Sequence, residues 1–172
     1  TGAARLMLAL AEVRANAQGL DWVFCDTDSM AIAKPEAMEI SEFFEKAKAV
    51  CAWFDPLNPY EKKGELFKIE DANRKPKTEE LEPLYAFCIS SKRYVLFNYG
   101  NDGKPVIRKA SAHGLGHFLP PYDEKDALTP LSKNISLREI GVECWQYDLW
   151  GKILEAAHSD TPEMVDFSFH PA

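Results

Sequence analysis

Long apolar runs and paired cysteines are both absent from this 172-residue chain, and each absence excludes a class of protein. No apolar run approaches the roughly 18 to 20 residues that a membrane-spanning helix needs, and the N-terminus has no signal-like segment. The four cysteines are widely spaced and form no C-x-x-C pair, which argues against a disulfide framework or a zinc ribbon. These features predict a protein with reduced thiols and no membrane partner, and they favour a cytoplasmic location.

The composition, in contrast, is that of a folded protein. Apolar residues make up 46% of the chain and aromatic residues 12%, which is enough for one domain with a sizeable core or for part of a larger protein. The net charge of −7 opposes a nucleic-acid partner, but residues 61–109 carry eleven Lys or Arg and only eight Asp or Glu. Solvated surface is the usual explanation for such a basic centre. Because the sequence opens at Thr1 within a helical pattern, we expect a piece of a longer protein.

Apolar spacing predicts two helices around a β-hairpin in the first third of the chain. Residues 3–18 form the first helix, with apolar positions at helical intervals: Leu6, Leu10, Val13 and Ala17. The apolar runs 22–25 and 30–33 have strand length and flank turn-favouring residues, which predicts a tight hairpin. Pro35 suits the first turn of a second helix, whose apolar face comprises Ile40, Phe43, Phe44, Ala47, Val50, Cys51 and Phe54.

The rest of the chain predicts a sheet followed by helices. Stretches rich in aromatic and β-branched residues predict four strands, at 66–70, 84–90, 93–99 and 105–110. A G-N-D-G turn signal occupies residues 100–103. Helical signals follow from Ser136, with a capping-box spacing to Glu139 and a stripe of Trp145, Leu149, Ile153 and Ala156. The predicted fold class is therefore α+β, an antiparallel sheet with flanking helices followed by a helical segment.

Two aspartates, Asp26 and Asp28, lie at the tip of the predicted hairpin with only Thr27 between them. At a hairpin tip, residues i and i+2 can present their side chains to the same side. Two neighbouring carboxylates repel each other, and a bound cation is one remedy. Carboxylate oxygens suit Mg²⁺ or Mn²⁺ better than zinc. The competing interpretation is a polar turn in which both side chains cap backbone N–H groups.

Two other families of carboxylate site fit the hairpin less well. A Ca²⁺ loop of the EF-hand type starting at Asp26 fails, because its sixth and twelfth positions would be Ala31 and Ala37 instead of glycine and glutamate. A phosphohydrolase of the haloacid dehalogenase type also has an apolar strand ending in D-x-D. Met30 stands where that family has Thr or Val, and no G-D-x-x-x-D follows. This phosphohydrolase remains only an alternative.

The residues F-C-D-T-D-S at 24–29, together with the preceding helix and the following M-A-I-A-K-P-E, resemble motif C of family B DNA polymerases, written Y-x-D-T-D-S. In that family a helix of the form T-x-x-(G)-R-x-x-L leads into the motif, similar to residues 1–8. A second family signature, K-x-Y, often occurs as K-K-R-Y. Here S-K-R-Y occupies residues 91–94, with Lys92 sixty-three residues after Ser29. Both motifs occur in the family's order and at its interval.

The resemblance implies a role for each matching residue. Asp28 is similar to the carboxylate that ligates two catalytic ions, Mg²⁺ or Mn²⁺, and Asp26 to its partner carboxylate. Lys92, Arg93 and Tyr94 form the signature that binds DNA, in which Lys92 and Tyr94 hold the primer and Arg93 points the other way as an exposed or paired charge. The implied activity is template-directed nucleotidyl transfer to a primer 3′-hydroxyl, with primer–template DNA and deoxynucleoside triphosphates as partners.

The chain also departs from the family pattern. Phe24 replaces the usual tyrosine of motif C, and Cys25 replaces a small residue. The first aspartate motif, D-x-x-S-L-Y-P, and the fingers motif, K-x-x-x-N-S-x-Y-G, are absent from these 172 residues. The resemblance thus implies the C-terminal part of a palm domain at 1–118 and the start of a thumb-like helical region at 119–172. We expect the isolated chain to be inactive without the upstream part of the polymerase. The alternative is a non-catalytic DNA-binding or scaffolding remnant.

Three further groups of residues have a functional interpretation that ranks below a structural one. Two glycines lie between His113 and His117 and argue against a metal site on a helix face. Two tryptophans in the predicted helix are expected to pack, with stacking on bases as the alternative. A basic cluster lies in a polar loop, where solvated surface is the default and contact with the DNA backbone the alternative. These groups are His113 with His117, Trp145 with Trp150, and Arg74 with Lys75 and Lys77.

Overall fold

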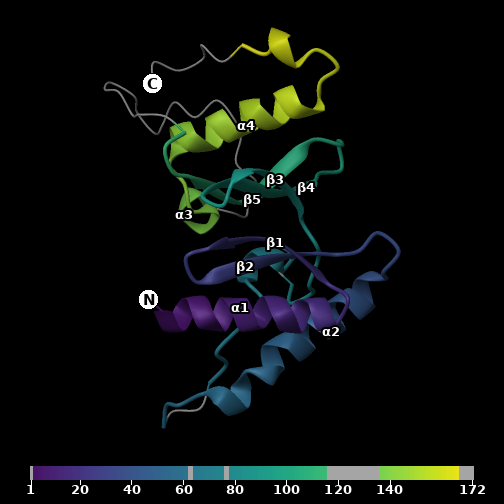
Figure 1. Cartoon of the computed structure of the whole chain (residues 1–172). Helices are drawn as coiled ribbons and strands as arrows, with labels where there is room; N and C mark the ends of the chain where they lie inside the picture. Colours follow the sequence, from purple (N-terminus) through teal and green to yellow (C-terminus); the bar gives the residue numbers. More distant parts are fainter. Residues whose placement is uncertain (1, 62–63, 76–77, 116–135, 167–172) are drawn as a thin grey trace. The chain divides into compact units, whose positions relative to one another are not determined.

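The computed structural model describes residues 2–61, 64–75, 78–115 and 136–166, and it is mixed α+β, as predicted (Figure 1). The chain divides into two compact units, Thr1–Pro83 and Leu84–Ala172, each with its own antiparallel sheet. The boundary expected between residues 118 and 119 falls outside the described residues. Each unit is described by itself below.

The first unit contains the predicted hairpin between two helices. Its elements are α1 (Gly2–Ala17), β1 (Asp21–Asp26), β2 (Ser29–Ala33), α2 (Ile40–Trp53) and the 3₁₀ helices η1 (Asp55–Leu57) and η2 (Asp71–Asn73). Strands β1 and β2 pair antiparallel, with Cys25 opposite Met30 and Asp26 opposite Ser29. The first helix and the hairpin are therefore confirmed, and only the two residues 27 and 28 separate the strands.

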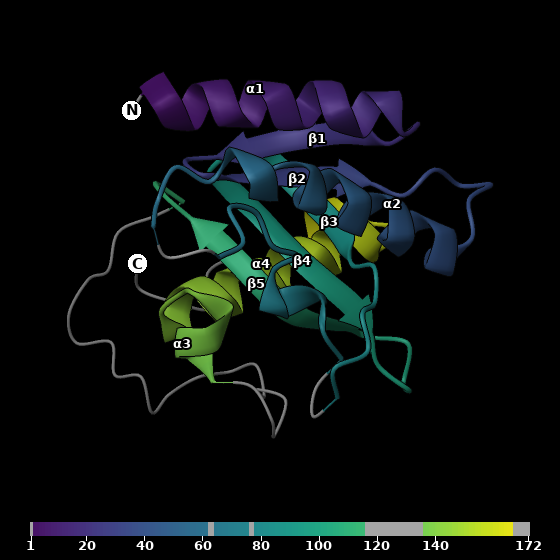
Figure 2. The same cartoon turned by 90° about the horizontal axis from the view of Figure 1, so that it is seen from below.

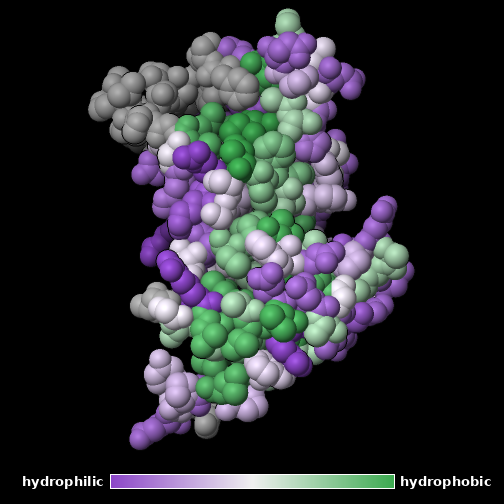
Figure 3. Space-filling model, in the orientation of Figure 1, coloured by the Kyte–Doolittle hydropathy of each residue, from purple (hydrophilic) through white to green (hydrophobic). Residues whose placement is uncertain are grey.

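Helix α1 runs along the hairpin (Figures 1 and 2) and packs through a different face from the predicted one. Ala11 and Ala15 are buried, because small side chains let the helix axis approach the strands closely. Leu6 and Val13 of the predicted stripe are each 62% exposed, and hydrophobic atoms gather over α1 in Figure 3. The prediction of this face was wrong because α1 carries apolar residues on several sides, so spacing alone does not select one.

The predicted start of the second helix was also wrong. Helix α2 begins at Ile40, and Pro35 lies in the preceding irregular segment. The ammonium of Lys34 donates hydrogen bonds to the main-chain oxygens of Pro35 at 2.9 Å and Met38 at 2.8 Å. These bonds satisfy carbonyl groups outside a helix, so the segment is stable as a turn. The apolar face of α2 is largely as predicted, with Phe43, Phe44, Ala47 and Val50 buried.

The strand predicted at 66–70 does not form. This segment is irregular and leads into η2. Its apolar side chains nevertheless pack into the unit: Phe67 lies against Phe54 with ring centroids 4.6 Å apart, and Ile69 packs on the cluster around Leu20. The short apolar run therefore indicated partly buried side chains but did not indicate a strand.

The second unit is a three-stranded sheet with helices. Its elements are β3 (Tyr85–Ser90), β4 (Arg93–Tyr99), β5 (Pro105–Ala112), α3 (Leu137–Ile140), α4 (Cys144–His158) and the 3₁₀ helix η4 (Pro162–Met164). The strands are antiparallel in the order β3-β4-β5. The three later strand predictions are confirmed, and so is the turn at 100–103, where Gly103 has φ +75°.

Helix α4 covers one face of this sheet (Figure 1) and contributes Tyr147, Trp150 and Leu154 to the core. The buried side chains of this cluster come from the sheet and from both helices: Val95, Phe97, Ile107, Ala110, Ala112, Ile140, Tyr147, Trp150 and Leu154. Gly141, at φ +94°, separates α3 from α4, and α4 starts with a capping box formed by Glu143 and Gln146. The predicted helical region is therefore present but divided in two.

All four cysteines, Cys25, Cys51, Cys88 and Cys144, are free thiols. Within the described ranges, no helix combines the length and the apolar character that crossing a bilayer requires.

Candidate functional site

The residues that match the two polymerase motifs lie at two turns, one in each unit. Residues 27 and 28, the acidic turn, join β1 to β2, and residues 91 and 92, the basic turn, join β3 to β4. Each turn has two residues, and the second of them, Asp28 or Lys92, is an exposed charged residue. Asp26 is the last residue of β1, and Arg93 and Tyr94 open β4.

The acidic turn has a strained backbone. Thr27 has φ +58° and is the only non-glycine residue with positive φ among those described. The main-chain N–H of Asp28 donates to the main-chain oxygen of Asp26 at 2.7 Å, so Thr27 is the centre of a γ-turn. A β-branched residue rarely adopts this conformation, which costs on the order of 1–3 kcal/mol. Residues held in such conformations cluster at active sites and ligand clamps.

Local hydrogen bonds hold the acidic turn in this shape. The Thr27 hydroxyl donates to Oδ1 of Asp26 at 3.1 Å, and the Ser29 hydroxyl donates to the main-chain oxygen of Asp26 at 3.1 Å. Asp26 is half-buried, whereas Asp28 is exposed. The two carboxylates therefore have different surroundings: Asp26 is held by its neighbours, and Asp28 projects from the turn into solvent.

The strands beneath the acidic turn are anchored in the core of the first unit. Met30 and Ile32 of β2 pack on a buried cluster of Ala15, Leu20, Phe43 and Phe44, which brings together α1, the loop before β1 and α2. Burial raises the pKa of the neighbouring Cys25 thiol, with a further contribution from Glu12. The thiol is therefore protonated at neutral pH and is a poor metal ligand, so the carboxylate oxygens are the metal ligands that this hairpin offers.

The donor chemistry of Asp26 and Asp28 fits a hard divalent cation. Both supply anionic oxygens, the ligands preferred by Mg²⁺ and Mn²⁺. Across the described ranges, no group of three or more His, Cys, Asp or Glu side chains is arranged to hold a metal ion. Two carboxylates alone should bind Mg²⁺ weakly, because the ion gives up its water reluctantly and favours six oxygen ligands.

Two exposed cations, Lys92 in the basic turn and Arg93 directly after it, precede a buried tyrosine. Lys92 is exposed, whereas Tyr94 is only 3% exposed. Arg93 pairs with Ala112 of β5, and its Nε donates to the main-chain oxygen of His113 at 2.7 Å. Side chains alternate along a strand, so Arg93 and Tyr94 leave β4 on opposite faces, as the sequence predicted.

The two tryptophans in α4 are buried core residues. Trp145 is 5% exposed, and its Nε1 donates to the Glu143 carboxylate at 2.8 Å. Trp150 is fully buried in the cluster beneath the sheet. Neither ring is accessible for stacking on a base, so the packing interpretation is confirmed. In the H-G-L-G-H segment, His113 directly follows β5, and His117 lies outside the described residues.

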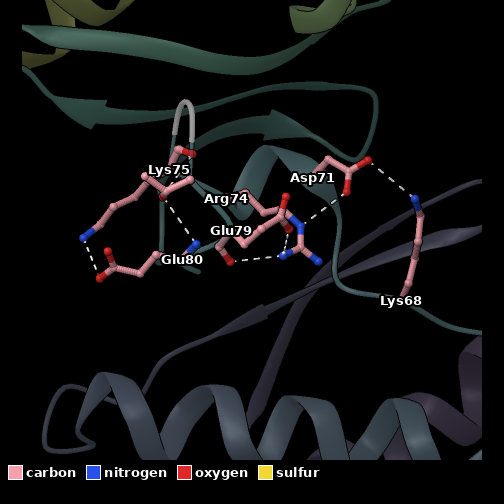
Figure 4. Close-up of polar contacts among 7 residues, drawn as sticks. Lys68, Asp71, Arg74, Lys75, Glu79 and Glu80 are labelled. Atoms are coloured by element: carbon pink, nitrogen blue, oxygen red, sulfur yellow. Dashed lines mark hydrogen bonds and ion pairs between the residues drawn. The ribbon is translucent and has the colours of Figure 1, made fainter.

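The basic cluster of the first unit is neutralised by ion pairs (Figure 4). Arg74 contacts the carboxylate of Glu79 at 2.8 Å, and Lys75 contacts that of Glu80 at 2.7 Å. The bond to Glu80 raises the pKa of Lys75. These cations already have carboxylate partners, which favours solvated surface over contact with DNA. Lys77 lies outside the described residues.

The same segment borders an open cavity of about 470 Å³ against α2. Its cations are ion-paired with its own carboxylates, Lys48 with Glu45 at 3.0 Å and Arg74 with Glu79. The cavity thus has no excess of positive charge for an anion.

Sequence reasoning missed the residues that support the basic turn. Ser111 and His113 bond to the main chain of Lys92 across the sheet. The pattern that could have indicated them is a histidine and a glycine directly after a strand, in H-G-L-G, because Gly114 has φ +69°.

No protein-family model, curated protein or solved structure matches this chain. The polymerase resemblance therefore depends on the two motifs themselves.

Proposed function

We propose that this chain is part of a DNA-directed DNA polymerase of family B and contributes the C-terminal part of its palm. The observation that carries the proposal is the acidic turn. The motif D-T-D-S spans a two-residue hairpin turn, with Asp26 and Ser29 paired on either side of it. The first turn residue, Thr27, has a strained φ of +58°. A merely polar turn would not require strain at a threonine, whereas a site that must hold a carboxylate in one position can use it.

Within this proposal Asp26 and Asp28 hold the divalent cations. When bound, such ions activate the primer hydroxyl and stabilise the charge on the leaving pyrophosphate. The exposed carboxylate of Asp28 is the accessible ligand, and Asp26 is oriented by the Thr27 hydroxyl at 3.1 Å. The carboxylates and the turn lie at the end of a hairpin, so a nucleotide can approach without displacing a core residue.

Lys92 contacts the primer backbone in the same proposal. An exposed ammonium neutralises a phosphate without reading sequence, which suits an enzyme that must accept every primer. Tyr94 is 3% exposed, so we assign the phosphate contact to Lys92 and a supporting role beneath the basic turn to Tyr94.

The test starts with the coding sequence upstream of Thr1. The proposal expects D-x-x-S-L-Y-P and K-x-x-x-N-S-x-Y-G in frame there, and primer extension with Mg²⁺ by the longer protein that an Asp28→Ala variant lacks. The isolated chain, assayed beside the same variant, should extend no primer with Mg²⁺ or Mn²⁺. Unrelated upstream sequence, or unchanged extension by the Asp28→Ala protein, would contradict the proposal. Extension by the isolated chain that Asp28→Ala abolishes would show that the chain completes its own metal site.

A second candidate is a non-catalytic DNA-binding remnant of a polymerase. It is favoured by the small donor set at the acidic turn, since the described part of the chain groups no three metal-ligating side chains. A start codon or unrelated sequence directly upstream, combined with DNA binding that requires Lys92, would support this candidate.

A further inference from the structure

The basic turn is held from across the sheet by the segment that follows β5. The main-chain oxygen of Lys92 accepts two hydrogen bonds, from the Ser111 hydroxyl at 2.9 Å and from the main-chain N–H of His113 at 3.2 Å. Strand pairing places Arg93 opposite Ala112 and Tyr94 opposite Ser111. The position of the Lys92 main chain is therefore set by residues about twenty positions away in the sequence, and its side chain stays exposed.

The side chain of Arg93 adds a third hydrogen bond, from the start of β4 to the segment after β5. Its Nε donates to the main-chain oxygen of His113 at 2.7 Å, so both main-chain polar groups of His113 bond to the basic turn or to the residue after it. A hydrogen bond from an ionised donor is stronger than a neutral one. The arginine side chain therefore ties residue 113 to the first residue of β4, directly after Lys92.

Gly114 leaves the space that the arginine needs. Its φ of +69° disfavours any other residue, and a Cβ atom at this position would lie 3.0 Å from Nη2 of Arg93. A larger residue would both strain the backbone and push the guanidinium away. We call Ser111, His113 and Gly114, together with Arg93, the brace.

We propose that Arg93 is a positioning residue: through the brace it fixes Lys92 for contact with a DNA phosphate, and it does not contact the phosphate itself. This inference rests on the DNA-binding role of Lys92 proposed above. It assigns different tasks to the two neighbouring cations. Lys92 provides the charge that meets the nucleic acid, and Arg93 provides the Nε–H that holds the turn.

A pair of substitutions separates positioning from direct contact. Glutamine has an amide nitrogen at the same place along the side chain as Nε of arginine, so Arg93→Gln can keep the bond to His113 while losing the charge. Arg93→Met has similar length, the same loss of charge and no donor. Binding of the 172-residue chain to a fluorescent primer–template duplex is measured by anisotropy across a salt series, for both variants and for Lys92→Ala.

Positioning predicts that Arg93→Gln keeps near-normal affinity and salt slope, whereas Arg93→Met weakens binding roughly three- to tenfold, about the effect of losing one phosphate contact. In the Lys92→Ala background, Arg93→Met should then have no further effect, because it acts through Lys92. Equal losses for glutamine and methionine, each lowering the log–log salt slope by about 0.9 and adding to the Lys92→Ala loss, would overturn the inference.

Amide hydrogen exchange tests the brace without DNA. The His113 N–H should exchange faster in Arg93→Met and Gly114→Ala than in the parent and Arg93→Gln proteins, because its acceptor is the Lys92 carbonyl. Equal exchange in all four proteins would also overturn the inference. If the His113 N–H exchanges faster in Arg93→Met and Gly114→Ala but Lys92→Ala leaves DNA binding unchanged, the brace exists and the proposed DNA-binding role of Lys92 is wrong.

Discussion

The acidic turn and the basic turn have the same plan but are held in different ways. Both connect antiparallel strands through two residues, and both place a charged residue second, Asp28 in one and Lys92 in the other. The acidic turn is stabilised by hydrogen bonds among residues 26–29 and contains a strained threonine. The basic turn has no residue with positive φ, and its support comes from residues 111–114.

This difference shows two ways of fixing a charged side chain at a hairpin tip. Local hydrogen bonds hold the acidic turn without any distant residue, so the turn can face an incoming ligand on several sides. A distant brace restricts the basic turn without strain, but it makes Lys92 depend on residues far along the chain. Substitutions should therefore act locally in the first unit and at a distance in the second.

The largest expected effect concerns the charge at the acidic turn. In the longer protein, Asp28→Asn should lower the rate of nucleotide incorporation by about 100-fold or more, because an amide oxygen binds Mg²⁺ less strongly than a carboxylate and several kcal/mol of charge stabilisation are lost. Asp26→Asn should also impair the rate, but less. Single-turnover primer extension measures both.

The matched control is Asp21→Asn, the same chemical change at the exposed first residue of β1. It should leave the rate unchanged. Near-normal extension by the Asp28→Asn protein would rule out a catalytic role for the acidic turn.

A smaller effect is expected from the charge at the basic turn. Lys92→Ala should weaken binding to every primer–template sequence alike and reduce the log–log salt slope by about 0.9, the value for one lost phosphate contact. Lys104→Ala removes an exposed lysine from the β4–β5 turn and should not change the slope. An unchanged slope for Lys92→Ala, or the same change in both variants, would mean that Lys92 contributes only general surface charge.

Glycine substitutions at matching positions compare the two backbones directly. Thr27→Gly should raise the free energy of unfolding by about 1 kcal/mol, because glycine adopts positive φ without steric cost. Ser91→Gly, the corresponding first position of the basic turn, relieves no positive φ and should leave stability unchanged or lower it by a few tenths of a kcal/mol. Urea unfolding measures both, and equal responses would show that the two turns are under the same strain.

The smallest effect is expected from pH, and here the units should behave alike. Burial raises the pKa of the Cys51 thiol in the first unit and of the Tyr147 hydroxyl in the second. A folded-state pKa above the unfolded value means stability that is complete below the unfolded pKa, near 8.5 for a thiol and 10 for tyrosine, and is lost as pH rises through the folded value. Stability should fall between about pH 8 and 11.

Cys51→Ala should reduce the earlier part of this decline, by less than about 1 kcal/mol because the thiol is only partly buried. Urea unfolding at several pH values measures the slope. A stability that rises over this range would contradict the burial of both groups.

The sequence predicted the strands on both sides of each turn but not how the turns are held. Apolar runs beside D-T-D-S and S-K-R-Y indicate strands because buried strands need apolar side chains. The positive φ of Thr27 could not be predicted, since threonine disfavours it. The brace depends on a contact between residues 93 and 113, which no local pattern encodes.

The errors in α1 and at residues 66–70 have related causes. Helix α1 is apolar on more than one side, so its buried face is chosen by the small size of Ala11 and Ala15 rather than by the larger Leu6 and Val13. Residues 66–70 satisfy the apolar criterion for a strand, but Phe67 and Ile69 find their contacts without pairing to a neighbouring strand. Side-chain burial was predictable in that segment, and backbone pairing was not.

Paramagnetic broadening by Mn²⁺ tests most directly whether the acidic turn binds a divalent cation. Amide signals of the 172-residue chain are recorded while Mn²⁺ is added at substoichiometric amounts, for the parent protein, Asp28→Asn and the Asp21→Asn control. If Asp26 and Asp28 form the cation site, the signals of residues 26–29 should broaden first in the parent and Asp21→Asn proteins. In the Asp28→Asn protein these signals should no longer broaden before the others. Broadening that begins at other carboxylates, such as those of residues 79–82, or that is unchanged in Asp28→Asn, would contradict a metal site at the acidic turn.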